Sequence, residues 1–462
     1  MNFLTVAPRF MTFRSALAFI VATFLLLPAN AQQRSSGPPN IVLIMVDDLG
    51  YGDLSSYGAD ALQTPHVDSL VAAGMRFDRF YANSPVCSPS RASLLTGQYP
   101  DVAGVPGVIR THARNSWGYL SPKEVLLPQL LARTGYHTAM VGKWHLGLEP
   151  PNIPTARGFD YFKGFLGDMM DDYYTHRRHG HNYMRRNDRV IDPKGHATTL
   201  FTDWSRDYIR QRDSSRAPFF LYLAYNAPHA PIQPPAEWRA QVAEREPQLS
   251  DERTGIVALI EHLDHEIGRV VEALQQTGAY ENTMIVFTSD NGGALYHGAS
   301  NGSLRGGKQD MYEGGVRVPT AITWPGHIEA GTQSDYLGMT MDLYPTLADV
   351  ADVRMNRHLD GRSLLPVLRG TTTSSGEDRT LFWVRREGGP EYMGKAAHAV
   401  RHGPWKLLQN RPGEPFHLYH LGRDPREQTD VKKTHPEQFE SLSESLRRHI
   451  QEAGRVPWQP PR

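Results

Sequence analysis

Four polar clusters along the chain each follow a short apolar run bounded by polar residues or glycine, the pattern of a buried strand. In open α/β sheets, ligands bind outside the carboxyl ends of the strands. Side chains that are far apart in the sequence can therefore converge on one site. The runs and the candidates that follow them are 41–46 with Asp47 and Asp48, 136–141 with Lys143 and His145, 219–225 with His229, and 284–287 with Asp290 and Asn291.

Asp47, Asp48, Asp290 and Asn291 offer carboxylate and amide oxygens, without sulfur or imidazole. This ligand set suits a hard cation, calcium before magnesium, rather than zinc. A divalent cation also keeps adjacent carboxylates ionised at a buried strand end. Taken alone, Asp-Asp equally fits a helix N-cap followed by a surface acid. The matching pair at 290–291 favours the metal site.

The single cysteine, Cys87, begins the run Cys-Ser-Pro-Ser-Arg, which ends at Arg91. Ser88 fits a helix N-cap, Pro89 the first helical position and Gly97 the C-cap. We therefore expect Cys87 to lie just before a helix whose free N–H groups and dipole favour an anion. Arg91 can add a charge-assisted contact to sulfate or phosphate. The bland alternative is that Cys87 is a small buried hydrophobe, a common role for free cysteine.

The composition is that of an ordinary globular protein, with 462 residues, 49 basic and 49 acidic side chains and 40% hydrophobic residues. This length suffices for one large domain and a smaller one. The formal net charge of +0 gives no reason to expect a nucleic-acid partner, whose binding needs a basic surface.

The N-terminus has a separate character. Arg9 and Arg14 precede the apolar run 16–27, and Ala-Asn-Ala follows at 29–31. This pattern predicts a cleaved signal peptide over residues 1–31 and export to the periplasm or the medium. The run is shorter than the ~20 residues of a membrane span, and no other segment is apolar enough, so we expect no membrane span. A lone cysteine in an exported protein calls for a specific explanation.

Helical patterns at 67–73, 124–133 and 255–275 alternate with the apolar runs. This alternation predicts an α/β fold with a large, mainly parallel β-sheet flanked by helices. After the Asp-Gly turn at 360–361 the pattern changes to short strands and a final helix, 436–453. We therefore predict a catalytic domain at 32–374 and a smaller C-terminal α+β subdomain at 375–462, with a small antiparallel sheet.

The motif at 87–97, Cys-x-Pro-Ser-Arg with Ala-x-x-Leu-Thr-Gly, resembles the signature of the type I sulfatases, of the alkaline phosphatase superfamily. In that family the cysteine is oxidised to Cα-formylglycine, whose hydrate is the nucleophile. The resemblance spans nearly the whole mature chain. Its other motifs, in order, are Val-Asp-Asp-Leu-Gly at 46–50, Gly-Lys-Trp-His-Leu-Gly at 142–147, Ala-Pro-His at 227–229, Ser-Asp-Asn-Gly at 289–292 and Gly-Gly-Lys at 306–308.

The resemblance implies roles for these residues. One Ca²⁺ would be bound by Asp47, Asp48, Asp290, Asn291 and the hydrate formed from Cys87. Arg91, Lys143 and Lys308 would hold the sulfuryl group. His229 would protonate the leaving alcohol, and His145 would take a proton from residue 87 to expel sulfate. A formylglycine-generating enzyme that acts on Cys87 would be a necessary partner.

The basic stretch within 168–189 holds five arginines and could bind a sulfated glycan, with Asp168, Asp171, Asp172, Tyr173 and Tyr174 contacting sugar hydroxyls. A solvated loop is an equal alternative. With export, this stretch favours a carbohydrate sulfatase over an enzyme for small aryl sulfates.

Two rival functions remain open on the sequence alone. A phosphodiesterase or phosphonate monoester hydrolase of the same superfamily can use the same converted cysteine. A glycan-binding pseudoenzyme would lack a catalytic residue, and none is missing here.

Overall fold

The computed structural model describes residues 1–8, 37–112, 116–212, 217–388, 391–392 and 394–454. It divides into two units, Met1–Ser35 and Ser36–Arg462. Of the first unit only residues 1–8 are described, without helix or strand, so most of the predicted signal peptide at 1–31 lies outside the described residues. Among those residues no helix combines the length and apolarity that crossing a bilayer requires.

The second unit is built on a sheet whose central strand, β1 (Asn40–Val46), is buried along its whole length. Successive side chains of a strand point to opposite faces. Ile41 and Leu43 enter one apolar core, whereas Val42 and Ile44 enter a second. A strand that is covered on both faces needs apolar side chains at every position, which explains the unbroken apolar run in the sequence.

Ten strands form this sheet in the described part of the chain. Its central strands, β11, β1, β10, β4 and β5, run parallel, whereas β12 and β8 on either side of them pair antiparallel. This arrangement confirms the predicted α/β fold. The strands in sheet order are β13 (Thr332–Ser334), β2 (Met75–Phe77), β12 (Thr320–Thr323), β11 (Thr283–Ser289), β1, β10 (Phe219–Ala224), β4 (His137–Lys143), β5 (Tyr161–Phe165), β8 (Met184–Arg186) and β9 (Arg189–Val190).

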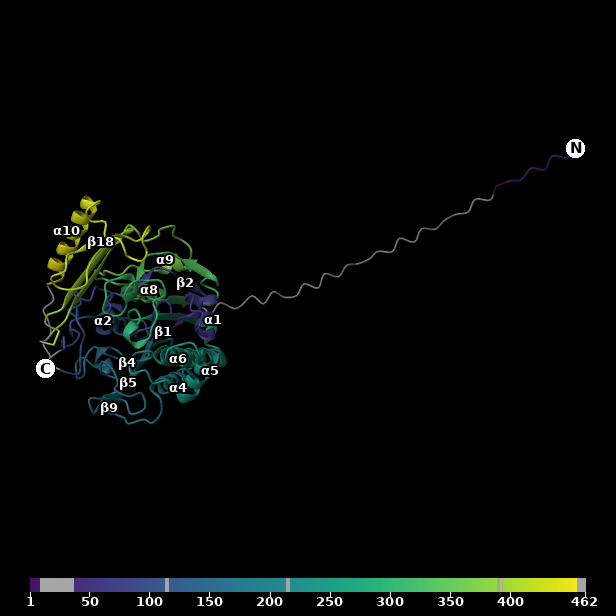
Figure 1. Cartoon of the computed structure of the whole chain (residues 1–462). Helices are drawn as coiled ribbons and strands as arrows, with labels where there is room; N and C mark the ends of the chain where they lie inside the picture. The colour runs from purple at the N-terminus through teal and green to yellow at the C-terminus, as the bar shows by residue number, and fades with distance from the viewer. Residues whose placement is uncertain (9–36, 113–115, 213–216, 389–390, 393, 455–462) are drawn as a thin grey trace. The chain divides into compact units, whose positions relative to one another are not determined.

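Helices cover both faces of the sheet. On one face α4, α5 and α6 lie side by side (Figure 1), and α1 packs against α6. On the other face α2, α3 and α8 pack on the core that contains Ile41. Their bounds are α1 (Pro65–Ala72), α2 (Cys87–Thr96), α3 (Leu127–Ala132), α4 (Ala197–Arg210), α5 (Ala236–Arg245), α6 (Asp251–Gln276) and α8 (Leu343–Val350).

The predicted helix at 124–133 starts three residues too early. Leu126 is extended, and α3 begins at the next residue with a proline in its first turn. Shorter elements connect the larger ones. They are β3 (Phe80–Tyr81), β6 (Arg177–Arg178), β7 (His181–Asn182), β14 (Gly338–Met339), α7 (Glu313–Val316), α9 (Leu365–Leu368), and the 3₁₀ turns η1 (Ser55–Tyr57), η3 (Pro154–Arg157), η4 (Tyr280–Asn282), η5 (Leu295–His297) and η6 (Thr340–Asp342).

A four-stranded antiparallel sheet and a final helix form the predicted C-terminal α+β part. One face of this sheet packs on α10 through Leu442 and Leu446, and the other contributes Trp383 to a core shared with Tyr81. The division at residue 375 stays a prediction. The elements are β15 (Thr380–Arg386), β16 (Ala396–His402), β17 (Trp405–Gln409), β18 (His417–His420) and α10 (Pro436–Ala453).

Candidate active site

The four predicted strand ends meet at one edge of the sheet, because β11, β1, β10 and β4 are consecutive neighbours. The polar residues that follow them lie together with the start of α2 and with the loop after β11. We call this group the strand-end cluster. It contains every residue that the sequence nominated for the site: Asp47, Asp48, Cys87, Arg91, Lys143, His145, His229, Asp290, Asn291 and Lys308.

Cys87 is itself the first residue of α2. The prediction that Ser88 caps this helix is wrong. The N-cap position is held by the extended residue Val86, and the Ser88 Oγ instead accepts a hydrogen bond of 3.0 Å from the backbone N–H of Ile109. Gly97 ends the helix in the left-handed region, at φ 70°, as predicted. Cys87 therefore sits within the helix terminus, where the helix dipole favours negative charge.

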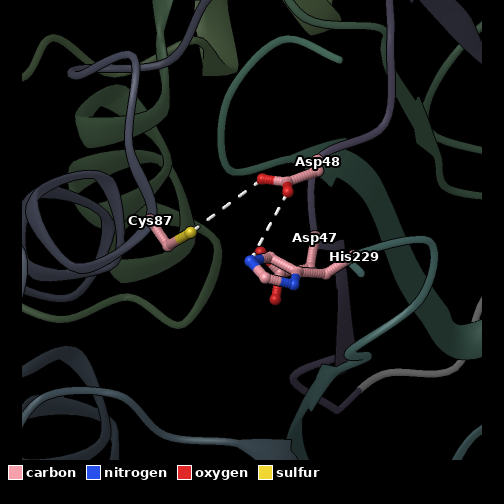
Figure 2. A group of neighbouring side chains, drawn as sticks. All are labelled: Asp47, Asp48, Cys87 and His229. Carbon is pink, nitrogen blue, oxygen red and sulfur yellow. Dashed lines mark hydrogen bonds and ion pairs between the residues drawn. The ribbon is translucent and has the colours of Figure 1, made fainter. Parts of the chain in front are cut away.

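The oxygen atoms of the cluster are arranged as a cation site. Figure 2 shows Asp47, Asp48, Cys87 and His229 facing one another, and one ligand atom from each lies within 4.8 Å of the others. Two buried oxygens, Asp47 Oδ1 and Asn291 Oδ1, have no hydrogen-bond partner among the described residues. Buried polar atoms are almost always paired, so these two call for a ligand. A hard cation that takes oxygen ligands fits them.

Three carboxylates and three cationic side chains pair within the cluster. Lys143 Nζ lies 2.5 Å from Asp47 Oδ2, Arg91 donates to Asp290 at 2.8 Å, and Lys308 Nζ lies 2.7 Å from Asp48 Oδ2. The cluster as described is therefore close to neutral, and a dication with a bound sulfate dianion would leave that balance unchanged. The cluster can accept such a pair of ions without a buried excess of charge.

The pKa values of the carboxyl groups differ although all are buried. Burial opposes ionisation of Asp47, but Lys143 holds its pKa well below the ordinary value. Burial and the neighbouring Asp47 raise the pKa of Asp290 to about 7. A divalent cation would counter both causes of that rise, because it favours the ionised form. The pKa values of these carboxyl groups therefore favour a bound cation in the cluster.

The two histidines carry their proton on different ring nitrogens. His145 Nε2 lies 2.6 Å from the carbonyl oxygen of Ile109 and must carry the proton, which leaves Nδ1, buried and without a described partner, as the basic nitrogen. His229 donates from Nδ1 to the Ala230 carbonyl at 2.7 Å, so its Nε2 faces Asp48 Oδ2 at 3.5 Å. Burial lowers both pKa values, assisted by Lys143 at His145 and by Lys308 at His229.

A cavity of about 240 Å³ opens onto the cluster. Cys87, His145, His229 and Lys308 line it, whereas Arg91 and Lys143 lie fully buried behind that wall. Most of the other lining residues are polar, and they lie outside the sequence motifs. They include Arg110, Asp168, Arg178, Tyr296, His297, Gln309, Arg385 and Tyr392.

The sequence proposed Tyr173 as a sugar contact, but this side chain is buried and its hydroxyl donates 2.8 Å to the backbone carbonyl of His229. Tyr173 therefore holds a site residue in place. The sequence also missed Arg385, which donates to the carbonyl of Gln309, next to Lys308. No local signal marked Arg385. A sequence signal did exist for Tyr296, because it follows Asn291 in the segment after the same strand.

Comparisons with known proteins agree with this geometry. Residues 39–353 match the sulfatase family, and residues 307–455 match the family described as N-sulphoglucosamine sulphohydrolase, C-terminal. N-acetylgalactosamine-6-sulfatase from Rattus norvegicus is 34% identical, covering 94% of this chain and 88% of its own length. Arylsulfatase A from Homo sapiens is also 34% identical, with 87% and 85% covered.

Solved structures resemble the fold over the same extent. Ps i-CgsB, crystallised with k-i-k-neocarrahexaose, superposes with a TM-score of 0.84 at 31% identity and covers 92% of this chain and 95% of its own. The phosphonate monoester hydrolase of Agrobacterium radiobacter shares the fold alone, with a TM-score of 0.65 at 22% identity. The superposition covers 89% of this chain and 96% of the hydrolase chain.

Proposed function

The chain belongs to the sulfatase family and is a sulfuric ester hydrolase, as its motifs predicted, and on this premise we propose that it removes sulfate from a sulfated sugar in a Ca²⁺-dependent reaction at residue 87. The proposal includes oxidation of Cys87 to Cα-formylglycine. The observation that carries it is the pair of unpartnered buried oxygens, Asp47 Oδ1 and Asn291 Oδ1, beside the cysteine that begins α2.

Ca²⁺ is the cation that suits this site. Asp47, Asp48, Asp290 and Asn291 supply only oxygen atoms, and calcium accepts six to eight such ligands in flexible geometry, whereas magnesium demands a near-ideal octahedron. When bound, Ca²⁺ supplies positive charge against the sulfate oxygens, and the hydrated formylglycine supplies the nucleophilic hydroxyl. The amide of Asn291 is held for this role, because its Nδ2 donates to Asp48 at 2.8 Å and leaves Oδ1 free for the cation.

The chain's own side chains supply the other parts of the reaction. Lys308 reaches the cavity wall, and Arg91 and Lys143 support the site from behind with fixed positive charge. His229 Nε2 is the nitrogen that can carry a proton to the leaving alcohol, and its lowered pKa eases release of that proton. His145 Nδ1, unprotonated because Nε2 donates to Ile109, accepts a proton on the same cavity wall.

A sugar is the proposed carrier of the sulfate. Relatives that cover most of this chain are named for N-acetylgalactosamine 6-sulfate, and a structural neighbour above 30% identity was crystallised with a carrahexaose. The polar wall of the cavity, which extends well beyond the strand-end cluster, also suits a hydroxylated substrate.

Export and maturation complete the proposal. The leader pattern at 1–31 supports secretion or a periplasmic location. A formylglycine-generating enzyme is the partner that converts Cys87. Conversion has to precede or accompany folding, because Cys87 is only 3% exposed in the folded chain.

The first test is the mass of the tryptic peptide that contains residue 87, from protein made together with a maturation enzyme. Conversion of the thiol to an aldehyde lowers the peptide mass by ~18 Da. We expect this shift, together with hydrolysis of 4-nitrophenyl sulfate that far exceeds hydrolysis of bis(4-nitrophenyl) phosphate. Preference for the phosphodiester would instead assign the site to the phosphodiesterase function.

Cys87→Ala is the matched control, because it removes the reactive group and leaves a small apolar side chain at a buried position. We expect its sulfatase activity to fall by at least about 1000-fold, as on removal of a catalytic nucleophile, with an unchanged melting temperature. Equal activity of the variant would exclude residue 87 as the nucleophile.

A further inference from the structure

The cavity beside the strand-end cluster has a wall that the catalytic roles do not explain. Its volume, about 240 Å³, lies just below the range of about 300–1,000 Å³ that is typical of small-molecule pockets, so it suits a single ring with its sulfate. Part of this wall is formed by Asp168 and Arg178, which belong to the basic stretch at 168–189. The chemistry of these two side chains indicates what the wall binds.

Arg178 differs from its neighbour Arg177 on the two-residue strand β6. Successive side chains of a strand point to opposite sides. Arg177 pairs with the exposed Asp192 at 2.8 Å and does not line the cavity. Arg178 lines the cavity and is held by two carboxylates, with Nε 3.2 Å from Asp168 Oδ1 and Nη1 2.7 Å from Asp171 Oδ1. Its Nη2 makes no hydrogen bond to a described residue.

Asp168 presents a complementary acceptor. Its Oδ1 is occupied by Arg178, by Thr111 Oγ1 at 3.4 Å and by the backbone N–H of Met169 at 3.0 Å. Its Oδ2 accepts no hydrogen bond from the described residues, although the side chain is only 9% exposed. Asp168 and Arg178 therefore bring a free acceptor and a free donor to one cavity wall, in positions fixed by their mutual contact.

The pairing of these two side chains favours hydroxyl groups as their ligand. Arg178 is already held by the carboxylates of Asp168 and Asp171. A free donor beside a free acceptor matches a sugar hydroxyl, which both donates and accepts a hydrogen bond, whereas a sulfate only accepts. The ring of Tyr296 lines the same cavity and is 57% exposed, so it offers an aromatic face to the apolar side of a ring.

We infer that Asp168 and Arg178 bind uncharged hydroxyl groups of the sugar ring that carries the scissile sulfate, with Tyr296 as a packing surface. The inference rests on the proposed sulfatase function and adds a substrate-recognition role to it. It also assigns the substrate-binding part of the basic stretch to one arginine, so the stretch does not act as a general anion-binding surface.

The test compares sugar and aryl substrates in Arg178→Ala and Asp168→Asn, using D-galactose 6-sulfate, N-acetyl-D-galactosamine 6-sulfate and 4-nitrophenyl sulfate. The aryl ester presents no ring hydroxyls. We expect the ratio of kcat/KM for a sugar sulfate to kcat/KM for the aryl sulfate to fall about 10- to 100-fold in each variant, the effect of a lost hydrogen bond to a charged group. Arg177→Ala, the matched control, keeps the wild-type ratio.

A wild-type ratio in both cavity variants, or hydrolysis of the aryl ester without hydrolysis of either sugar sulfate by the wild-type protein, would overturn the inference. An equal loss on sugar and aryl substrates would also overturn it, because it would indicate a structural role. If the converted wild-type protein hydrolyses none of the three esters, the proposed function fails first and the sugar-binding role fails with it.

Discussion

Two groups of buried charges in this chain invite comparison. The strand-end cluster surrounds Cys87, and a second group joins α7 to the C-terminal sheet through Glu313, Lys406 and Glu427, which we call the C-terminal ion cluster. In the second group Lys406 Nζ lies 2.9 Å from both Glu313 Oε1 and Glu427 Oε1. The second oxygen of each glutamate is also occupied, by the Tyr81 hydroxyl at 2.7 Å and by the Glu313 N–H at 2.7 Å.

The difference between the clusters lies in their oxygen atoms. In the C-terminal ion cluster all four glutamate oxygens lie within 2.9 Å of a protein donor, although Glu313 also borders a cavity. The strand-end cluster leaves Asp47 Oδ1 and Asn291 Oδ1 without described partners and opens onto a cavity through Cys87. Burial of charge is therefore not the mark of a functional site in this chain. Nor does a single unpaired buried atom mark one, because such atoms, Trp324 Nε1 among them, also occur elsewhere among the described residues. The strand-end cluster is distinguished by two unpaired oxygens that lie beside a cysteine and two histidines on one cavity wall.

Breaking the C-terminal ion cluster is expected to have the largest effect, and that effect is on stability. Lys406→Met leaves two glutamates without their buried cation, and removal of one partner from a buried ion pair costs about 3–5 kcal/mol. Lys432→Met is the control, because Lys432 pairs with Asp430 at 3.1 Å where both side chains are about a quarter exposed. Such an exposed pair is worth at most about 1 kcal/mol. Equilibrium unfolding in urea measures both, and equal losses would contradict the comparison.

A smaller effect is expected at the strand-end cluster. Asn291→Ala removes an oxygen that has no described partner in the protein, and it also removes the Nδ2 that donates to Asp48 at 2.8 Å, a loss of about 2 kcal/mol without calcium. With calcium it should raise the concentration needed for half-maximal activity by at least about 10-fold, the effect of losing an interaction that supports a metal site.

Calcium should also stabilise the wild-type protein by about 2.7 kcal/mol at 100 times its dissociation constant. The gain should be much smaller in Asn291→Ala at the same calcium concentration, as measured by thermal unfolding with and without a chelator. An undiminished calcium response would place the cation elsewhere.

The last effect concerns pH. Burial, together with the nearby Glu313, raises the pKa of Glu427 to about 7, from an ordinary value near 4.5. The unfolded chain releases this proton above about pH 4.5 and the folded chain only near pH 7, so stability contributed by this group falls between those values and is level above. We expect a loss of at most about 3 kcal/mol, because one pKa unit corresponds to about 1.4 kcal/mol, measured by unfolding at pH 5 and pH 7.5. Glu427→Gln should abolish this part of the pH dependence.

The local pattern of the sequence determined most of the framework. Unbroken apolar runs mark strands covered on both faces, as β1 shows, and the final helix spans the predicted residues 436–453. Because the polar residues directly follow those runs, their meeting at one sheet edge follows from the order of the residues alone. The motif at 87–91 named the family for the same reason: its spacing is a property of consecutive residues.

Tertiary structure decided what depends on contacts between distant segments. Ser88 does not cap its helix because α2 begins one residue earlier, at Cys87, and the Ser88 hydroxyl instead accepts from Ile109, which the fold brings close. The basic nitrogen of His145 is set by that same residue's carbonyl, and only the fold shows that Arg178 rather than Arg177 faces the cavity. Residue types determine which interactions are possible. The interactions that form depend on which face of a helix or strand meets each neighbouring element. A shift of one residue reverses the face of a strand, so local sequence alone does not decide this.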